Sequence, residues 1–198
     1  MTRKVQARTL ATRDRLLSAG REIAQSAGLA GLRTDEVVLR AGTAKGTFFA
    51  HFPDRDHFLA ALLAESLTAD LANLAPPTDR DTLRATLDRV FLAFAADAET
   101  VALLARFSGP AGVGLGLDLM ICAVIDRLAL GLGAMQAQGL VANRAPPQVL
   151  AEGLLALVFH AAASAQCPVV AQGDSLAVRA RAGQLLRDMT EALIWPKV

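Results

Sequence analysis

Residues 34–52 read Thr-Asp-Glu-Val-Val-Leu-Arg-Ala-Gly-Thr-Ala-Lys-Gly-Thr-Phe-Phe-Ala-His-Phe, and this stretch decides the fold of the N-terminal part of the chain. Its first half predicts a short helix with Val37, Val38 and Ala41 on the apolar side, and its second half predicts another short helix. Gly42 lies between them and permits the positive φ that a tight turn requires. Two short helices joined by a three- or four-residue turn containing glycine form a helix-turn-helix.

The second predicted helix carries few charges and begins with small residues, which suits insertion into the major groove of DNA. Its N-terminal amides and Thr43 can face phosphate oxygens at the positive end of the helix dipole. Lys45 offers a cation to a phosphate or a guanine edge, and Thr47 can form a hydrogen bond or offer its methyl group to thymine. Gly46 lowers the helix propensity, which close approach of the backbone to DNA would explain.

Other side chains of the segment have expected roles beside the groove. His51 and Arg55 can reach the flanking DNA backbone, while Phe48 and Phe52 are expected to anchor the second helix to the first. Taken singly, each of these residues has an ordinary explanation as a solvated turn, a surface histidine or a core aromatic. Their occurrence together and in order favours DNA binding.

Composition and charge set the class of protein. Hydrophobic residues make up 53% of the 198 positions and charged residues 20%, which excludes intrinsic disorder. Ala and Leu dominate, Tyr is absent and alternating β-branched runs are lacking, so we expect an all-α fold of about nine helices. Residues 1–57 hold ten Lys and Arg against six acidic residues, whereas the remainder is slightly acidic, which indicates a polyanionic partner for the N-terminal part.

Cysteine usage and hydropathy indicate the compartment. Cys122 and Cys167 form no CxxC pair, which argues against a disulfide scaffold and a cysteine-based zinc site, and no cofactor or metal is expected. Mean hydropathy is high at +0.37, but His160 and Pro168 interrupt the most apolar stretch, residues 153–171. We therefore expect a cytoplasmic protein whose apolar helix faces are buried against each other or against a partner subunit.

Residues 13–64 resemble the DNA-binding head of the TetR family of bacterial transcriptional regulators. The helix that ends at Gly28 matches the opening helix of that family. Residues 41–49, Ala-Gly-Thr-Ala-Lys-Gly-Thr-Phe-Phe, resemble the family sequence AGVSKGTLY, and residues 51–59, His-Phe-Pro-Asp-Arg-Asp-His-Phe-Leu, resemble the following HFPSKEALL. The order and spacing of these segments make the resemblance fairly specific.

The resemblance implies a three-helix DNA-binding head at residues 1–55 and a helical ligand-binding and dimerisation body at residues 56–198. Four positions depart from the family pattern, three of them within residues 41–49: Thr43 replaces a valine, Ala44 replaces a serine, and Phe49 replaces a tyrosine that normally binds phosphate. Val38 replaces a small alanine where the two short helices cross. The predicted DNA contacts are Thr34, Thr43, Ala44, Lys45, Gly46, Thr47, Phe49, His51 and Arg55.

The function implied is a sequence-specific DNA-binding transcriptional regulator, in the simplest case a repressor that a small apolar ligand releases from its operator. One head reads only a few base pairs, so we expect a homodimer whose heads lie about 34–36 Å apart on a palindromic operator. By resemblance, the helices near residues 148–166 and 175–194 form the dimer interface, although either helix alone is compatible with burial in a monomer core.

The ligand would bind in the body and act through the helix at residues 54–73, which starts beside the DNA. Each apolar residue expected in its pocket is also compatible with ordinary core. The predicted lining is Arg89, Phe91, Phe94, Arg106, Phe107, Met120, Cys122, Met135, Phe159 and His160.

Two other classes of function compete with this interpretation. An enzyme is disfavoured because the sequence holds no HExxH motif, no Ser/His/Asp spacing and no cluster of paired carboxylates. The departures at Ala44 and Phe49 leave room for a dimeric helical ligand-binding protein whose head binds DNA weakly or not at all. DNA affinity that falls steeply with added salt separates a DNA binder from both alternatives.

Overall fold

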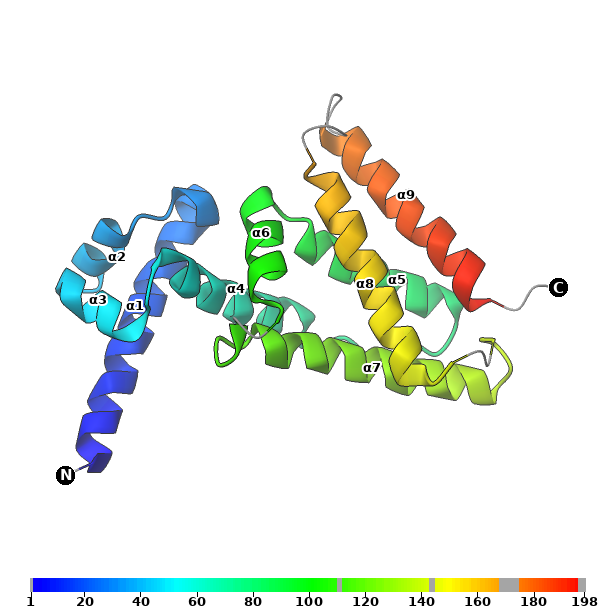
Figure 1. Cartoon of the computed structure of the whole chain (residues 1–198), viewed down its shortest axis with the longest axis horizontal. Coiled ribbons are helices and arrows are strands. Elements are labelled where there is room, and N and C mark those ends of the chain that lie inside the picture. The colour runs from blue at the N-terminus through cyan, green and yellow to red at the C-terminus, as the bar shows by residue number, and fades with distance from the viewer. Residues whose placement is uncertain (1, 110–111, 143–144, 168–174, 196–198) are drawn as a thin grey trace.

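The protein, represented by a computed structural model, is described at residues 2–109, 112–142, 145–167 and 175–195, and within these ranges it forms nine helices and no strand (Figure 1). The expected all-α class is therefore confirmed. The N-terminal helices form a head at one end of an elongated molecule, and the C-terminal helices lie at the other. The helices are α1 (Thr2–Gly31), α2 (Thr34–Arg40), α3 (Lys45–His51), α4 (Arg55–Leu71), α5 (Arg80–Phe94), α6 (Ala98–Phe107), α7 (Leu117–Ala137), α8 (Pro147–Ala165) and α9 (Ser175–Ile194).

Helix starts follow local capping chemistry. Asp54, Asp79 and Asp97 each precede a helix, and each side chain accepts a hydrogen bond from the backbone N–H three residues later. These bonds satisfy N–H groups that have no partner within the helix. At the other end of α1, Gly28 adopts a φ of 71°, which interrupts the helix where the sequence predicted its end.

The head is closed by a tight crossing of α1 and α4. A Cβ atom at Gly20 would lie 2.6 Å from the ring of Phe58 and 2.8 Å from Leu62, so only glycine permits this separation. Leu16 and Ile23 lie on the same side of α1 and are buried. The head and the body are thus joined along α4, whose buried residues extend from Phe58 to Leu71.

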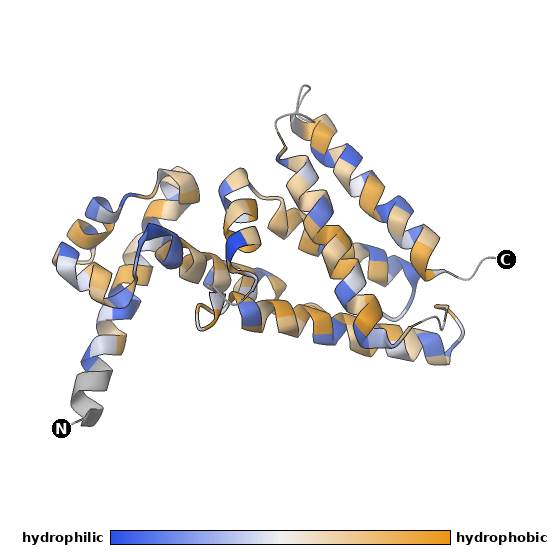
Figure 2. Ribbon diagram, in the orientation of Figure 1, coloured by the Kyte–Doolittle hydropathy of each residue, from blue (hydrophilic) through white to orange (hydrophobic). Residues whose placement is uncertain are grey.

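The body packs α8 among α5, α7 and α9. Leu154, Val158 and Ala161 are buried on α8, whose ribbon is mainly hydrophobic in Figure 2, whereas α9 alternates between hydrophobic and hydrophilic residues. Length and composition alone would allow α8 to cross a membrane, a property that core helices share. Its buried face against three neighbouring helices agrees with a core helix.

Candidate nucleic-acid interface

Helices α2 and α3 form the predicted helix-turn-helix. Residues 41–44 separate them, and Gly42 has a φ of 62°, the positive value that the turn requires. The turn is held by hydrogen bonds from the Gly42 N–H to the Leu39 carbonyl (3.2 Å) and from the Thr43 N–H to the Val38 carbonyl (2.9 Å). Val37 and Val38 are buried, as their spacing predicted.

Three aromatic rings fix α3 in place. Phe48 and Phe52 are 0% and 1% exposed, and their ring centroids lie 5.1 and 4.9 Å from that of Phe58 on α4. Phe48 and Phe52 are buried, as expected of anchoring residues, but the partner that the ring contacts show is Phe58 on α4 and not the first helix of the motif. The guanidinium of Arg13 lies 4.4 Å from the Phe52 ring centroid and covers its outer side. The back of α3 is therefore rigidly packed.

The other side of α3 faces solvent. Ala44, Lys45, Gly46 and Phe49 are exposed, and Phe49 is 48% accessible as a residue beside the buried Phe48. Thr34, Thr47 and His51 are half-buried. Most of the predicted DNA contacts thus lie at or near one accessible side of the motif, and as contacts they stay a prediction.

Lys45 forms an ion pair within this face. Its Nζ atom lies 2.7 Å from Oδ1 of Asp35, the second residue of α2. Both side chains are exposed, and with Thr34, Phe49 and Arg55 they line an open hollow of about 620 Å³. Asp35 was missing from the predicted site. The sequence signal for this pair is an acidic residue near the start of the first helix of the motif and a basic residue at the start of the second.

Thr43 differs from its expected role. Its hydroxyl oxygen is buried and has no hydrogen-bond partner among the described residues, so it does not point outward toward a phosphate. This inward position agrees with the apolar valine that the family sequence resembled by residues 41–49 has there. The prediction that the Thr43 hydroxyl faces phosphate is corrected accordingly, while its backbone N–H is used within the turn.

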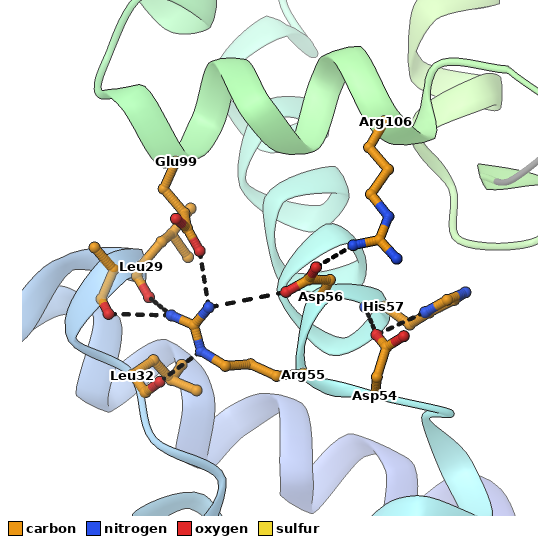
Figure 3. Close-up of polar contacts among 9 residues, drawn as sticks. Leu29, Leu32, Asp54, Arg55, Asp56, His57, Glu99 and Arg106 are labelled. Atoms are coloured by element: carbon orange, nitrogen blue, oxygen red, sulfur yellow. Dashed lines mark hydrogen bonds and ion pairs between the residues drawn. The ribbon is translucent and has the colours of Figure 1, made fainter.

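Arg55 joins three segments instead of extending freely into solvent (Figure 3). Its Nε atom donates to the Leu32 carbonyl (2.9 Å), and Nη2 donates to the carbonyls of Leu29 (3.1 Å) and Ala30 (3.0 Å). Nη1 lies 2.9 Å from Oε1 of Glu99 on α6. Arg55 therefore satisfies carbonyl groups at the end of α1 and connects them to the body, a role that the sequence did not indicate.

The residues on either side of Arg55 form a second polar group at the same junction, together with Arg106. Oδ1 of Asp54 accepts from the backbone N–H of His57 (2.8 Å) and lies 2.7 Å from its ring Nδ1, while Arg106 pairs with Asp56 (Figure 3). Burial acts to raise the pKa of Asp54, but the hydrogen bonds and the charge interactions with His57 and Arg106 outweigh it. The pKa of Asp54 is therefore lowered.

The predicted ligand-pocket residues occupy two different environments. Arg89, Arg106, Cys122 and His160 are exposed, and Arg106 pairs with Asp56 as described. The apolar residues belong to the continuous core, with Phe159 partly buried and its ring centroid 4.9 Å from that of Phe94. As ligand contacts, all of them stay a prediction. The fully or largely buried members are Phe91, Phe94, Phe107, Met120 and Met135.

A second hollow lies between the head and the body. It encloses about 630 Å³ and is walled by α1, α4 and the segment that joins α5 to α6. Leu62, Leu63 and Leu67 form an apolar floor, and the ion pair of Arg21 with Glu65 (3.7 Å) lies at its edge. Its volume falls in the range of small-molecule sites, and its walls come from both parts of the protein.

The outer face of α8 and α9 is apolar. Leu185, Met189 and Leu193 are 40–48% exposed, and the first two line a hollow of about 240 Å³ with Leu157 and His160.

No group of three or more His, Cys, Asp or Glu side chains that could hold a metal ion occurs among the residues that the structure describes.

Comparisons with known proteins agree with this geometry. Residues 16–62 match the family model described as bacterial regulatory proteins, tetR family. No curated protein matches the chain. A TetR-family transcriptional regulator of Pectobacterium atrosepticum is 23% identical with full coverage of both chains and a TM-score of 0.61.

Two further solved structures share the fold. SmeT, the repressor of the multidrug efflux pump SmeDEF of Stenotrophomonas maltophilia, is 21% identical, with 96% of this chain and 93% of SmeT covered and a TM-score of 0.59, and it has also been solved with triclosan. A transcriptional regulator of Saccharomonospora viridis in complex with choline is 20% identical, with 93% and 98% covered and a TM-score of 0.60. The helix-turn-helix segment of this chain thus matches the model of the bacterial regulatory proteins of the tetR family, and along its length the chain has the fold of solved TetR-family regulators.

Proposed function

We propose that this protein is a sequence-specific DNA-binding transcriptional regulator that inserts α3 into the major groove. The observation that carries the proposal is the two-sided character of α3: Phe48 and Phe52 fix its back to Phe58, while its front is exposed and presents Lys45 and Phe49. A helix held from behind with small residues at its N-terminal end suits close approach to base edges.

The proposed contacts divide into two kinds. Lys45 and Thr47 reach base edges, and Phe49 packs against a sugar or a thymine methyl group. Backbone amides at the start of α3, together with Thr34 and His51, contact phosphates on either side of the groove. Ala44 and Gly46 allow this approach because they have little or no side chain. Arg55 positions the head through its hydrogen bonds to α1 and contributes charge beside the groove.

Two copies of the chain would bind one palindromic operator in the cytoplasm. The exposed apolar residues Leu185, Met189 and Leu193 on α9, next to Leu157 and His160 on α8, support a homodimer through this face. Two-fold symmetry of the protein then requires two-fold symmetry of the DNA site.

A small, largely apolar ligand would release the protein from its operator. A ligand shifts the protein only if it prefers one arrangement of the heads, so a connection between ligand site and head is needed. Helix α4 and the Arg55–Glu99 ion pair supply such a connection, and the hollow of about 630 Å³ with its leucine floor offers space beside both. The complex of SmeT with triclosan supports a ligand of this kind.

The decisive experiment selects bound fragments from random DNA and sequences them. The recovered site is expected to be a palindrome, and affinity should fall by about 0.9 log units per log unit of salt for each phosphate neutralised. Lys45→Ala should weaken binding at constant stability, whereas Arg84→Ala, which removes a cation from the body near Glu191, should leave it unchanged. Recovery of no DNA, or equal binding by Lys45→Ala and the wild type, would contradict the assignment.

The second candidate is a dimeric helical ligand-binding protein with a weakened head. Phe49 favours it, since a tyrosine hydroxyl that would bind phosphate is missing from the exposed face. If the selection recovers no DNA, Phe49→Tyr combined with Ala44→Ser should restore binding under this candidate. We propose no catalytic activity.

A further inference from the structure

The ion pair between Asp35 and Lys45 lies in the face proposed to meet DNA. Asp35 is in the first turn of α2 and Lys45 begins α3, and their charged atoms are 2.7 Å apart. The two side chains are 77% and 58% exposed and border the same open hollow. A DNA duplex that reaches Lys45 therefore also meets the carboxylate of Asp35.

The pair does little for the stability of the fold. Exposed ion pairs are weak because water screens both charges and two side chains lose freedom when they pair. The neighbouring Glu36 is used differently, since it lies 3.5 Å from Arg40 one helical turn away. Asp35 thus places a carboxylate where DNA phosphates would approach, although its ion pair adds little to the stability of the fold.

A carboxylate in this position has two effects on DNA binding. It neutralises Lys45 and repels phosphates, which weakens binding to DNA of any sequence. It also accepts hydrogen bonds only, and the base-edge donor that suits it in the major groove is the N4 amino group of cytosine. That amino group lies next to the guanine O6 of the same base pair, and guanine O6 suits a lysine ammonium.

We propose that Asp35 is a specificity-determining residue that, together with Lys45, selects a G·C base pair in the operator. Away from the operator Asp35 holds Lys45 and suppresses binding to other sequences. On the operator Lys45 turns to guanine while Asp35 accepts from cytosine, so the charge that is unfavourable elsewhere gains a partner. This inference rests on the proposed function and assigns a reading role to a residue outside the predicted contact set.

The test compares the affinities of three proteins for three kinds of DNA. The proteins are the wild type, Asp35→Ala and Glu36→Gln, where Glu36→Gln removes the same charge one residue along without touching Lys45. The DNAs are the operator recovered by selection, the same operator with each G·C pair of its half-sites changed in turn to A·T, and an unrelated duplex. Thermal unfolding of each variant verifies that the fold is kept.

Asp35→Ala should bind the unrelated duplex more tightly and with a salt slope steeper by about 0.9, because Lys45 becomes free to neutralise a phosphate. At one G·C position per half-site, the wild type should lose about 5- to 150-fold on change to A·T, and Asp35→Ala should lose clearly less. Glu36→Gln should discriminate as the wild type does.

The inference is overturned if Asp35→Ala discriminates at every G·C position as strongly as the wild type does. It is also overturned if Asp35→Ala and Glu36→Gln raise the affinity for all three kinds of DNA equally, because the Asp35 carboxylate would then act only through its charge. Absence of any DNA binding by the wild type would instead contradict the proposed function itself. The two failures are therefore distinguishable in the same measurements.

Discussion

Arg55 and Glu99 are joined across the head and the body, with Nη1 of Arg55 2.9 Å from Oε1 of Glu99. The first residue of α4 is thereby fixed to the first turn of α6. The same guanidinium binds the carbonyls of Leu29, Ala30 and Leu32 at the end of α1. One side chain thus links the end of α1, the start of α4 and the first turn of α6.

Replacing Arg55 should cost more stability than breaking its ion pair. Arg55→Lys keeps the charge but cannot reproduce the planar donor set, and we expect a loss of about 1–3 kcal/mol in the free energy of unfolding. Glu99→Gln should cost at most about 1 kcal/mol, because the pair is partly exposed. Urea unfolding of both variants measures the difference. Equal losses would show that the carbonyl contacts contribute little.

Thr43→Val should stabilise the protein by about 1 kcal/mol, because the buried hydroxyl of Thr43 has no hydrogen-bond partner among the described residues. The change keeps the shape of the side chain and removes only the unsatisfied polar group. Thr43→Ser is the matched control, since it keeps the hydroxyl and removes the methyl group, and it should destabilise. Thermal unfolding distinguishes them, and a stabilised serine variant would refute the explanation.

Gly46→Ala should raise stability and weaken DNA binding at the same time. A Cβ atom at Gly46 meets nothing within 4 Å, so alanine should gain up to about 1 kcal/mol of helix propensity. The added methyl group would stand between α3 and the DNA, and we expect at least a roughly 10-fold loss of affinity, or about 1.4 kcal/mol.

Ala44→Ser is the companion to that variant. Ala44 occupies the N-cap of α3 without a side-chain hydrogen bond, and serine there should add about 1 kcal/mol of stability. Because the family sequence that residues 41–49 resemble has serine at this position, operator binding should be kept or tightened. Gel shifts and unfolding of both variants check the pair, and loss of binding by Ala44→Ser would mean that the groove has no room at the N-cap.

The Asp54–His57 contact should make part of the stability depend on pH. Because the folded-state pKa of Asp54 is lowered, its contribution is present above the ordinary aspartate pKa of about 3.9 and is lost as the pH falls through the lower folded value. Asp54→Asn should therefore lower the free energy of unfolding by at most about 1 kcal/mol at pH 7, since the Asp54 side chain is 47% exposed. At a pH below both the folded and the unfolded pKa the substitution should have no such effect.

Urea unfolding of the wild type and Asp54→Asn between pH 7 and pH 3 measures this difference. Asp126→Asn, at an exposed position of α7, is the matched control. A difference between the wild type and Asp54→Asn that stays constant over this pH range would exclude the ionised carboxyl as its source.

The features that the sequence predicted are those set by local chemistry. Gly42 and the spacing of Val37 and Val38 specify the helix-turn-helix, because a positive φ and a helical stripe depend only on neighbouring residues. The role of Arg55 escaped prediction because its partners lie 23 to 44 residues away. The inward turn of Thr43 escaped it as well, since a hydroxyl at a turn is equally compatible with either direction in the sequence.

The aromatic cluster behind α3 determines where the head can be divided from the rest. Phe58 packs on both Phe48 and Phe52, yet it lies beyond residue 55, the predicted end of the head. A fragment cut at that point would expose two large rings and leave Gly20 facing an empty space. The smallest autonomous folding unit must therefore carry the first two turns of α4 with it, so the helix that would transmit a signal from the body is also part of the head's own core.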